Sequence, residues 1–307
     1  MTNKFSTDHP QVPGFFRLKV GKIEITALCD GLGTFAPESF RSENSSVSVD
    51  ELKNLLDKDF TPRTVAGEAI LAINAFLVNT GEQLILIDAG KGNLEGGIFL
   101  EKEGLLVPSL RAAGFSPEDI EIILPTHLHN DHINGLEANG RSVFPDATLY
   151  IAEPEKNYWL DSEIAELPKE IHLAATRARS AVKPYVDAER VKTFRLGEEV
   201  FPHIKSVPVY GHTPGHTGYL ISSDNDSLFI WGDLLHIKGI QLIHPEISSI
   251  FDSDQKGAIK TREEMLPKLA ARKQLIAGSH LPFPGIGHID KQDGKYLFHP
   301  VEYQVFR

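Results

Sequence analysis

Apolar residues in this chain fall into short runs separated by polar and glycine-containing stretches, a pattern typical of a mixed α/β protein. Short β-branched runs predict strands at 15–28 (one or two strands), 70–78, 83–87, 120–124, 147–152, 204–209, 227–231, 275–277 and 296–305, the last an edge strand. Longer patterned stretches predict helices at 49–58, 105–113, 153–160, 161–190 and 255–272.

Local signals sharpen some of these boundaries. Ser48 is a good N-cap for the helix at 49–58, because Glu51 follows it three residues later. Asn79 to Glu82 form a predicted hairpin turn. Pro168 and Pro184 are expected to break the helical stretch at 161–190, since proline removes a helical hydrogen bond.

The order of the elements predicts a layered architecture. The strands come in two batches, each followed by helical stretches, which favours two sheets packed face to face with helices outside. We expect one domain over residues 1–307 that begins with an arm at 1–14. The helical insert at 153–190 is predicted to form a lid or a wall of the pocket.

Composition narrows the class of protein. The chain is 41% hydrophobic and 24% charged, as in ordinary globular proteins, and its net charge of −11 argues against nucleic acids and membrane surfaces as partners. Cys29 is the single cysteine, so an internal disulfide and a cysteine metal cage are excluded. The polar start of the chain lacks the apolar core of a signal peptide, so a cytoplasmic protein is expected.

Metal-type side chains concentrate after the apolar run 120–124. His127, His129, Asp131 and His132 fall within six positions there. Side chains two residues apart on extended backbone point the same way, so His127 and His129 can share one spot, while Asp131 and His132 can reach a second. Imidazole and carboxylate ligands suit divalent ions such as zinc. The stretch therefore predicts a metal site, and four donors hint at two ions.

Further candidate residues follow other predicted strands. His212 and His216 lie in one loop after 204–209, Asp233 follows 227–231, and His280 follows 275–277. Asp88, after 83–87, is either a turn-capping residue or a carboxylate that fixes the histidine loop. The remaining histidines, including His236, are expected at the surface, in the core or along the pocket.

The arrangement of these residues resembles the metallo-β-lactamase superfamily. The signature elements appear in family order: Asp88 after a strand, His-x-His-x-Asp-His at 127–132, Thr-Pro-Gly-His-Thr at 213–217, Gly-Asp at 232–233, and the strand-end His280. The resemblance implies an αββα four-layer sandwich, with two mixed sheets flanked by helices.

Finer details resemble the branch of methyl parathion hydrolases and dihydrocoumarin hydrolases. They are Glu24 to Gly31, Gly211 to Thr217 and His280 to Ile289. The residues between the ligands at 127–132 differ modestly from that branch, at positions that do not bind metal. Membership of this branch also implies a homodimer.

When the family's metal-binding positions are transferred to this sequence, they predict two ions, each with its own ligands. One ion is expected on His127, His129 and His216, the other on Asp131, His132 and His280, with Asp233 bridging both. The match places the ligand of the shared loop at His216, which leaves His212 as a structural or supporting histidine. Asp131 and Asp233 are the predicted catalytic carboxylates, and Asp233 orients the bridging water and accepts its proton.

The expected reaction is hydrolysis by a hydroxide that bridges two divalent ions, with zinc as the first expectation and manganese, iron or cobalt as alternatives. The resemblance implies small, hydrophobic, neutral ester substrates: lactones, including N-acyl-homoserine lactones, and aryl esters. Organophosphate triesters are the alternative substrates. The ligand set disfavours β-lactam hydrolysis. The lack of a basic patch disfavours glyoxalase-type thioester hydrolysis, and the chain is too short for the flavin domain of the iron-binding oxidoreductases.

Aromatic residues are expected to line an apolar pocket. Trp159 matches a pocket tryptophan of the branch, although an ordinary core position fits it equally well. The candidates are Phe35, Phe99, Trp159, Phe251 and Phe283.

Overall fold

Two large sheets form the centre of the protein. The computed structural model describes residues 11–12, 14–41, 46–93, 104–303 and 305, so Phe99 lies outside the described residues. The first sheet has the order β1 (Phe15–Val20), β2 (Ile23–Phe35), β3 (Ala69–Asn79), β4 (Leu84–Ile87), β5 (Ile122–Leu124), β8 (Thr148–Ala152) and β9 (Val191–Phe194). The second has the order β10 (Glu199–Phe201), β11 (Ile204–Pro208), β12 (Thr217–Ser223), β13 (Asp226–Ile230), β14 (Leu275–Ala277), β15 (Ile286–Gln292) and β16 (Lys295–Pro300).

Both sheets are mixed. β4, β5, β8 and β9 run parallel, as do β13 and β14, and the remaining neighbours pair antiparallel. A small ribbon of β6 (Glu137–Ala138) and β7 (Arg141–Ser142) stands apart. The chain enters the second sheet after β9, so each sheet is built from one continuous part of the sequence.

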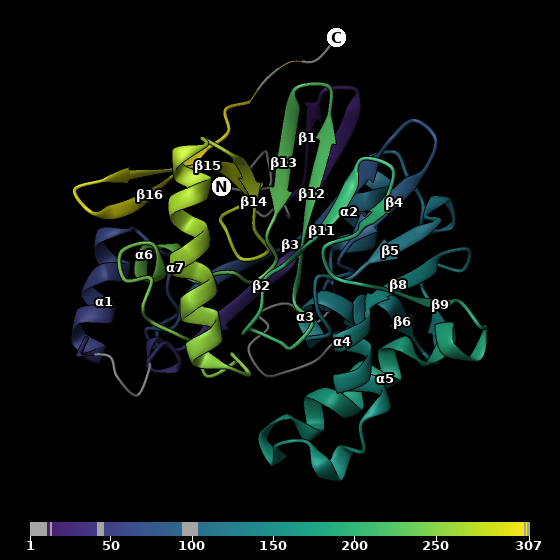
Figure 1. Ribbon diagram of the computed structural model, residues 1–307, viewed down its shortest axis with the longest axis horizontal. Coiled ribbons are helices and arrows are strands. Elements are labelled where there is room, and N and C mark those ends of the chain that lie inside the picture. The colour runs from purple at the N-terminus through teal and green to yellow at the C-terminus, as the bar shows by residue number, and fades with distance from the viewer. Residues whose placement is uncertain (1–10, 13, 42–45, 94–103, 304, 306–307) are drawn as a thin grey trace, which may run out of the picture.

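Helices lie outside the two sheets (Figure 1). The longer ones are α1 (Val49–Lys58), α2 (Leu106–Ala112), α5 (His172–Asp187) and α7 (Gln255–Ala271). The shorter ones are α3 (Asn130–Ile133), α4 (Glu153–Lys156) with a π-helical turn at Asn157–Asp161, and α6 (Lys238–Gln241). Single 3₁₀ turns occur at Pro37–Ser39, Pro117–Asp119, Asn134–Leu136, Ile164–Glu166 and Lys169–Ile171.

The alternation of side chains along β3 shows how the layers pack. Phe76 and Val78 enter the core between the sheets, where they meet residues such as Tyr219 of the second sheet. Ala75 and Leu77 point to the opposite face, toward the core under α2 and α5. Successive strand residues point to opposite faces, so a largely apolar strand such as β3 contributes side chains to two cores at once.

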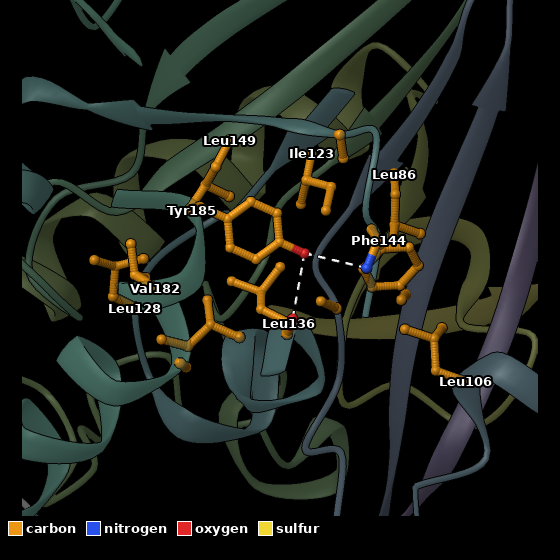
Figure 2. Close-up of a cluster of buried hydrophobic side chains, with 14 of the residues drawn as sticks. Leu86, Leu106, Ile123, Leu128, Leu136, Phe144, Leu149, Val182 and Tyr185 are labelled. Atoms are coloured by element: carbon orange, nitrogen blue, oxygen red, sulfur yellow. Dashed lines mark hydrogen bonds between the residues drawn. The ribbon is translucent and has the colours of Figure 1, made fainter. Parts of the chain in front are cut away.

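A helix covers the outer face of each sheet. Tyr185 of α5 is fully buried in the core of the first sheet, and its hydroxyl donates to the Leu136 carbonyl at 3.2 Å (Figure 2). The same hydroxyl accepts the Phe144 N–H at 3.3 Å. Leu266 and Leu269 of α7 pack on the second sheet. The order helix, sheet, sheet, helix confirms the predicted αββα sandwich.

Several predicted elements are confirmed in detail. The helix at Val49–Lys58 has the predicted bounds, and the Ser48 hydroxyl accepts the Glu51 N–H at 3.2 Å. The stretch 15–28 contains two strands, and β16 pairs only with β15 at the edge of its sheet, ending at Pro300 rather than at 305.

The expected break at Pro184 is wrong, because α5 continues through it to Asp187. Proline has no N–H to donate within a helix. Because Pro184 lies in the last turn of α5, few helical hydrogen bonds are lost. The insert at 153–190 runs through α4, the π-helical turn and α5 along the first sheet. Its role as a pocket wall and the single-domain organisation stay predictions. Among the described helices, none has both the length and the apolar character that crossing a bilayer requires.

Candidate metal centre

Loops that follow β5, β11, β13 and β14 meet at one edge of the sandwich. β5 leads to His127, and the short helix α3 presents Asp131 and His132. The second sheet contributes His212 from the loop after β11, and Asp233 and His280 after the parallel strands β13 and β14. Strand ends at a common edge bring residues from distant parts of the chain together.

Three imidazoles form the first group of the centre. The Nε2 atom of His127 lies 3.0 Å from Nδ1 of His129 and 3.2 Å from Nε2 of His212. These atoms fall within the span that a single metal ion could occupy. Neutral imidazoles at such spacing are typical metal ligands.

A carboxylate and two imidazoles form the second group. Oδ2 of Asp131 lies 3.4 Å from Nε2 of His280 and 3.8 Å from Nε2 of His132. His132 and His280 are almost completely buried. This mixed nitrogen and oxygen set also fits a divalent ion.

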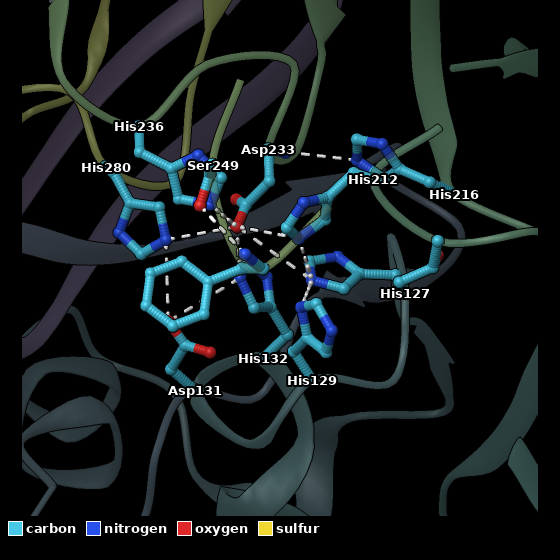
Figure 3. A network of polar contacts seen from close by, with 12 residues as sticks. His127, His129, Asp131, His132, His212, His216, Asp233, His236, Ser249 and His280 are labelled. Atoms are coloured by element: carbon cyan, nitrogen blue, oxygen red, sulfur yellow. Dashed lines mark hydrogen bonds and ion pairs between the residues drawn. The ribbon is translucent and has the colours of Figure 1, made fainter. Parts of the chain in front are cut away.

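The Asp233 carboxylate stands between the two groups, as Figure 3 shows. Its Oδ2 atom lies 3.4 Å from Nε2 of His212 on one side, and 3.3 and 3.2 Å from Nε2 of His132 and His280 on the other. Within the described part of the chain, Oδ1 of Asp233 and Nε2 of His132 have no hydrogen-bond partner. Buried polar atoms without partners are costly, so the donor set fits metal ions that would satisfy them.

Electrostatics favour the metal-binding states of His127, His129 and Asp233, whereas the neighbouring carboxylates raise the pKa of His132 and His280. Burial lowers the pKa of His127 and His129 well below the ordinary imidazole value, so both rings are neutral and offer lone pairs. Burial alone would raise the pKa of Asp233, but the imidazoles of His132 and His280 lower it well below the ordinary carboxyl value. Asp233 is therefore an ionised carboxylate at the centre of the cluster.

The structure contradicts the expected placement of His216. Both of its ring nitrogens are engaged by backbone: Nδ1 with the Val209 carbonyl at 2.9 Å, and Nε2 with the Asp233 N–H at 3.0 Å. The imidazole that joins His127 and His129 belongs to His212, which was expected to be the supporting histidine. His212 is therefore the candidate ligand of this loop in the structure, and His216 accepts a hydrogen bond from the backbone at Asp233.

Carboxylates orient some of the ligand histidines. Asp88 accepts the Thr126 N–H at 2.7 Å and lies 2.8 Å from Nδ1 of His132, so it contacts the histidine loop as the sequence suggested. Asp252 lies 2.8 Å from Nδ1 of His212 in the same way. Such contacts set the tautomer and the direction of a ligating ring. Nothing in the local sequence marks Asp252, because it reaches His212 from 40 residues away.

His236 is a further member of the cluster that the sequence analysis did not single out as a ligand. Its Nε2 lies 3.2 Å from Oδ2 of Asp233, and its ring stacks on His280 with centroids 5.3 Å apart. Nδ1 of His236 has no partner among the described residues. The sequence feature that could have indicated this role is the position of His236, three residues after Asp233.

The aromatic candidates lie in different places around the centre. Phe35 and Phe251 pack against each other and against the His236 ring, with Phe35 also 5.3 Å from the His280 ring. Trp159 is fully buried, and its ring lies 5.4 Å from that of His129.

A mainly apolar cavity of about 490 Å³ reaches the centre at His280. Phe283, which is 37% exposed, lines it together with Leu32, Leu71 and Ile237. The cavity is therefore a place where an apolar group could lie beside the metal ligands.

Comparisons with known proteins identify the family of the chain. The sequence profile of the Metallo-beta-lactamase superfamily matches residues 70–280, which include Asp88 and every ligand candidate. The chain belongs to the metallo-β-lactamase superfamily.

Two solved structures resemble 96% of the chain. The hydrolase AbOPH of the beta lactamase superfamily is 35% identical, with a TM-score of 0.88 over 96% of this chain and 100% of that one. AidC, a dizinc quorum-quenching lactonase crystallised with a product, is 30% identical, with a TM-score of 0.84 over 96% of this chain and 99% of that one. An N-acyl homoserine lactonase of Bacillus cereus is 27% identical over 175 residues, which span 52% of this chain and 62% of the lactonase.

Proposed function

We propose that the protein is a dinuclear metal-dependent hydrolase that cleaves hydrophobic lactones and aryl esters. One observation carries the proposal: a single carboxylate oxygen, Oδ2 of Asp233, lies within 3.4 Å of ligand nitrogens from both groups. A shared carboxylate between two three-residue groups is the arrangement that a two-metal hydrolytic site needs.

Each residue of the centre has a definite task in this proposal. One ion would be held by His127, His129 and His212, the other by Asp131, His132 and His280, with Asp233 common to both. When bound, such ions acidify a coordinated water and polarise the bond to be cleaved. The buried surroundings of Asp233 exclude bulk water and fix these ligands before a substrate arrives.

The cavity and the relatives support the proposed substrate class. The cavity beside His280 is lined mostly by apolar side chains, which suits an acyl chain or an aryl ring better than a charged group. Lactonases are among the similar proteins. The net charge of −11 also disfavours anionic substrates. N-Acyl-homoserine lactones and dihydrocoumarin are therefore the first substrates to test.

Zinc is the proposed metal. Five imidazoles and two carboxylates suit it, although manganese, iron and cobalt accept the same ligand types. Metal analysis of protein purified without added metal identifies the ion directly.

A chelation and reconstitution assay tests the proposed function. Protein stripped with a chelator should lose hydrolysis of N-acyl-homoserine lactones, dihydrocoumarin and p-nitrophenyl esters, and should regain it with two equivalents of Zn²⁺. Methyl paraoxon belongs in the same screen, because a neutral phosphotriester also fits an apolar cavity. If metal-loaded protein cleaves none of these compounds, the substrate class is wrong; a higher kcat/KM for methyl paraoxon would favour the phosphotriesterase alternative.

A further inference from the structure

One buried carboxylate connects the two loops that carry the first group of imidazoles. Glu155 lies in α4 and is 1% exposed. Its Oε1 accepts the Leu128 N–H at 2.8 Å, and its Oε2 accepts the Thr213 hydroxyl at 2.7 Å and the Gly215 N–H at 2.9 Å. The local sequence around Glu155 does not indicate a role for it.

The positions of these donors link Glu155 to the metal ligands. Leu128 stands between His127 and His129, so its peptide sets the spacing of those two rings. Thr213 directly follows His212. The same carboxylate thus fixes the backbone beside all three imidazoles of the first group.

Close packing at Gly215 supports the same conclusion. A Cβ atom added there would lie 2.3 Å from the Glu155 backbone nitrogen and 2.5 Å from its Cβ atom. The loop carrying His212 is therefore pressed directly onto α4, and glycine permits this approach because it has no side chain.

The chemistry of the contacts requires a carboxylate at this position. All three partners donate hydrogens, and an ionised carboxylate accepts on both oxygens, whereas a glutamine amide has one accepting oxygen and a donating NH₂ group. In a glutamine variant, one of the two loops would face a donor instead of an acceptor. Burial raises the pKa of Glu155 above the ordinary carboxyl value, and the hydrogen bonds from Leu128, Thr213 and Gly215 offset only part of that rise.

The second group is positioned by other residues. Nδ1 of His132 contacts Asp88 at 2.8 Å, and Nδ1 of His280 contacts the Ala72 carbonyl at 3.0 Å. Loss of the Glu155 contacts should therefore affect the two metal sites unequally.

We propose that Glu155 is a positioning residue that sets the distance between the His127–His129 loop and His212, and thereby the metal affinity of that site alone. The inference rests on the proposed function, because it assumes two ions. It concerns binding of the metal, so it can be tested without any substrate.

The test is a Zn²⁺ titration of the chelator-stripped full chain against a competing chelator. Wild-type protein should bind two ions, and Glu155→Gln should bind one of them about 10-fold to 100-fold more weakly, the usual cost of losing a residue that supports a ligand. Glu153→Gln is the matched control, since Glu153 is on the same helix and its side chain is 48% exposed. It should bind both ions as the wild type does.

A double variant identifies which of the two metal sites is affected. In a His212→Ala variant, which already lacks a ligand of the first group, adding Glu155→Gln should change the remaining affinity less than twofold. Unchanged affinity in the Glu155→Gln single variant, or an equal loss at both sites, would overturn the inference. If Glu155→Gln does not fold, the Thr213→Val variant, which removes only the hydroxyl contact to Glu155, provides the test. A loss of Zn²⁺ affinity at one site supports the inference, and wild-type affinity at both sites overturns it.

The two proposals fail in different ways. A wild-type protein that binds fewer than two ions contradicts the dinuclear centre and this inference together. A wild-type protein that binds two ions, with a Glu155→Gln variant that matches it, contradicts the role of Glu155 alone.

Discussion

At the scale of single residues, the hydrogen-bond partners of the two ring nitrogens decide whether a histidine can bind a metal. His212 has its Nδ1 atom beside Asp252, which leaves Nε2 directed at His127 and Asp233. His216 has both nitrogens bound to backbone groups, so it has no lone pair to offer a metal. Two histidines four residues apart in one loop therefore differ in whether a ring nitrogen is free to bind a metal.

This difference gives a direct prediction. His212→Ala should lower the bound metal from two ions to about one per chain, and it should also lower the free energy of unfolding, because the buried Asp252 carboxylate loses its imidazole partner. His216→Ala should keep both ligand groups but lower the free energy of unfolding by about 1–3 kcal/mol, because the Val209 carbonyl and the Asp233 N–H lose a buried partner. Metal analysis and urea unfolding measure the two effects, and His288→Ala, at an exposed histidine, is the control. Full metal content in His212→Ala would return His216 to consideration.

A second residue-scale prediction concerns the buried hydroxyl of Tyr185. Tyr185→Phe should cost about 1–3 kcal/mol of unfolding free energy, because the Leu136 carbonyl and the Phe144 N–H stay buried without that partner. Urea unfolding provides the measurement. Tyr303→Phe, at a side chain that is 82% exposed, should be neutral; equal stability of the two variants would show that water replaces the hydroxyl.

At the scale of elements, predictions succeed where the signal is local. Ser48 caps its helix through a contact three residues away, so the sequence contains the whole cause of that boundary. Asp131 and His132 could be placed beside the histidines because they share one short loop. The roles of His212 and Glu155 could not be predicted, because each depends on partners that the fold brings from other parts of the chain.

Helix α7 shows how an element outside the centre can stabilise it. Arg262 is buried, and its guanidinium donates to the carbonyls of Leu234 at 2.8 Å, Pro245 at 2.9 Å and Ile247 at 2.7 Å. Leu234 directly follows Asp233. The helix therefore anchors the turn that presents the shared carboxylate.

Replacing that arginine should destabilise the protein strongly. Arg262→Met leaves three buried carbonyls without their donor, so we expect the free energy of unfolding to fall by about 3 kcal/mol or more. Arg272→Met, at the exposed end of the same helix, should change it by less than about 0.5 kcal/mol. Guanidinium unfolding of both variants measures the difference, and similar values for the two would contradict the anchoring role.

At the scale of the whole molecule, the proposed metal ligands come from both halves of the sandwich. His127, His129, Asp131 and His132 belong to the first sheet's loops, while His212, Asp233 and His280 belong to the second's. Bound ions would therefore link the two halves in addition to their role in hydrolysis.

The αββα order could be predicted from the succession of elements and the family pattern, since both can be read directly from the sequence.

Removal of metal should consequently lower thermal stability. A ligand that binds only the folded state at 1,000 times its Kd adds about 4 kcal/mol, so the Tm should fall by several degrees when a chelator is added. Differential scanning calorimetry with and without chelator measures the shift, and excess Zn²⁺ should reverse it. The His212→Ala variant should show a smaller shift, and an unchanged Tm in wild-type protein would exclude ions that link the sheets.

The passage between the two sheets occurs in a short connection between β9, which ends at Phe194, and β10, which begins at Glu199. A cut in this connection would yield two fragments, each with a full set of strands for one sheet and only part of the ligand set. Neither fragment alone contains both His127 and Asp233. Recovery of catalytic turnover on mixing such fragments would thus report their reassembly, which makes this scaffold a natural starting point for a split-enzyme sensor.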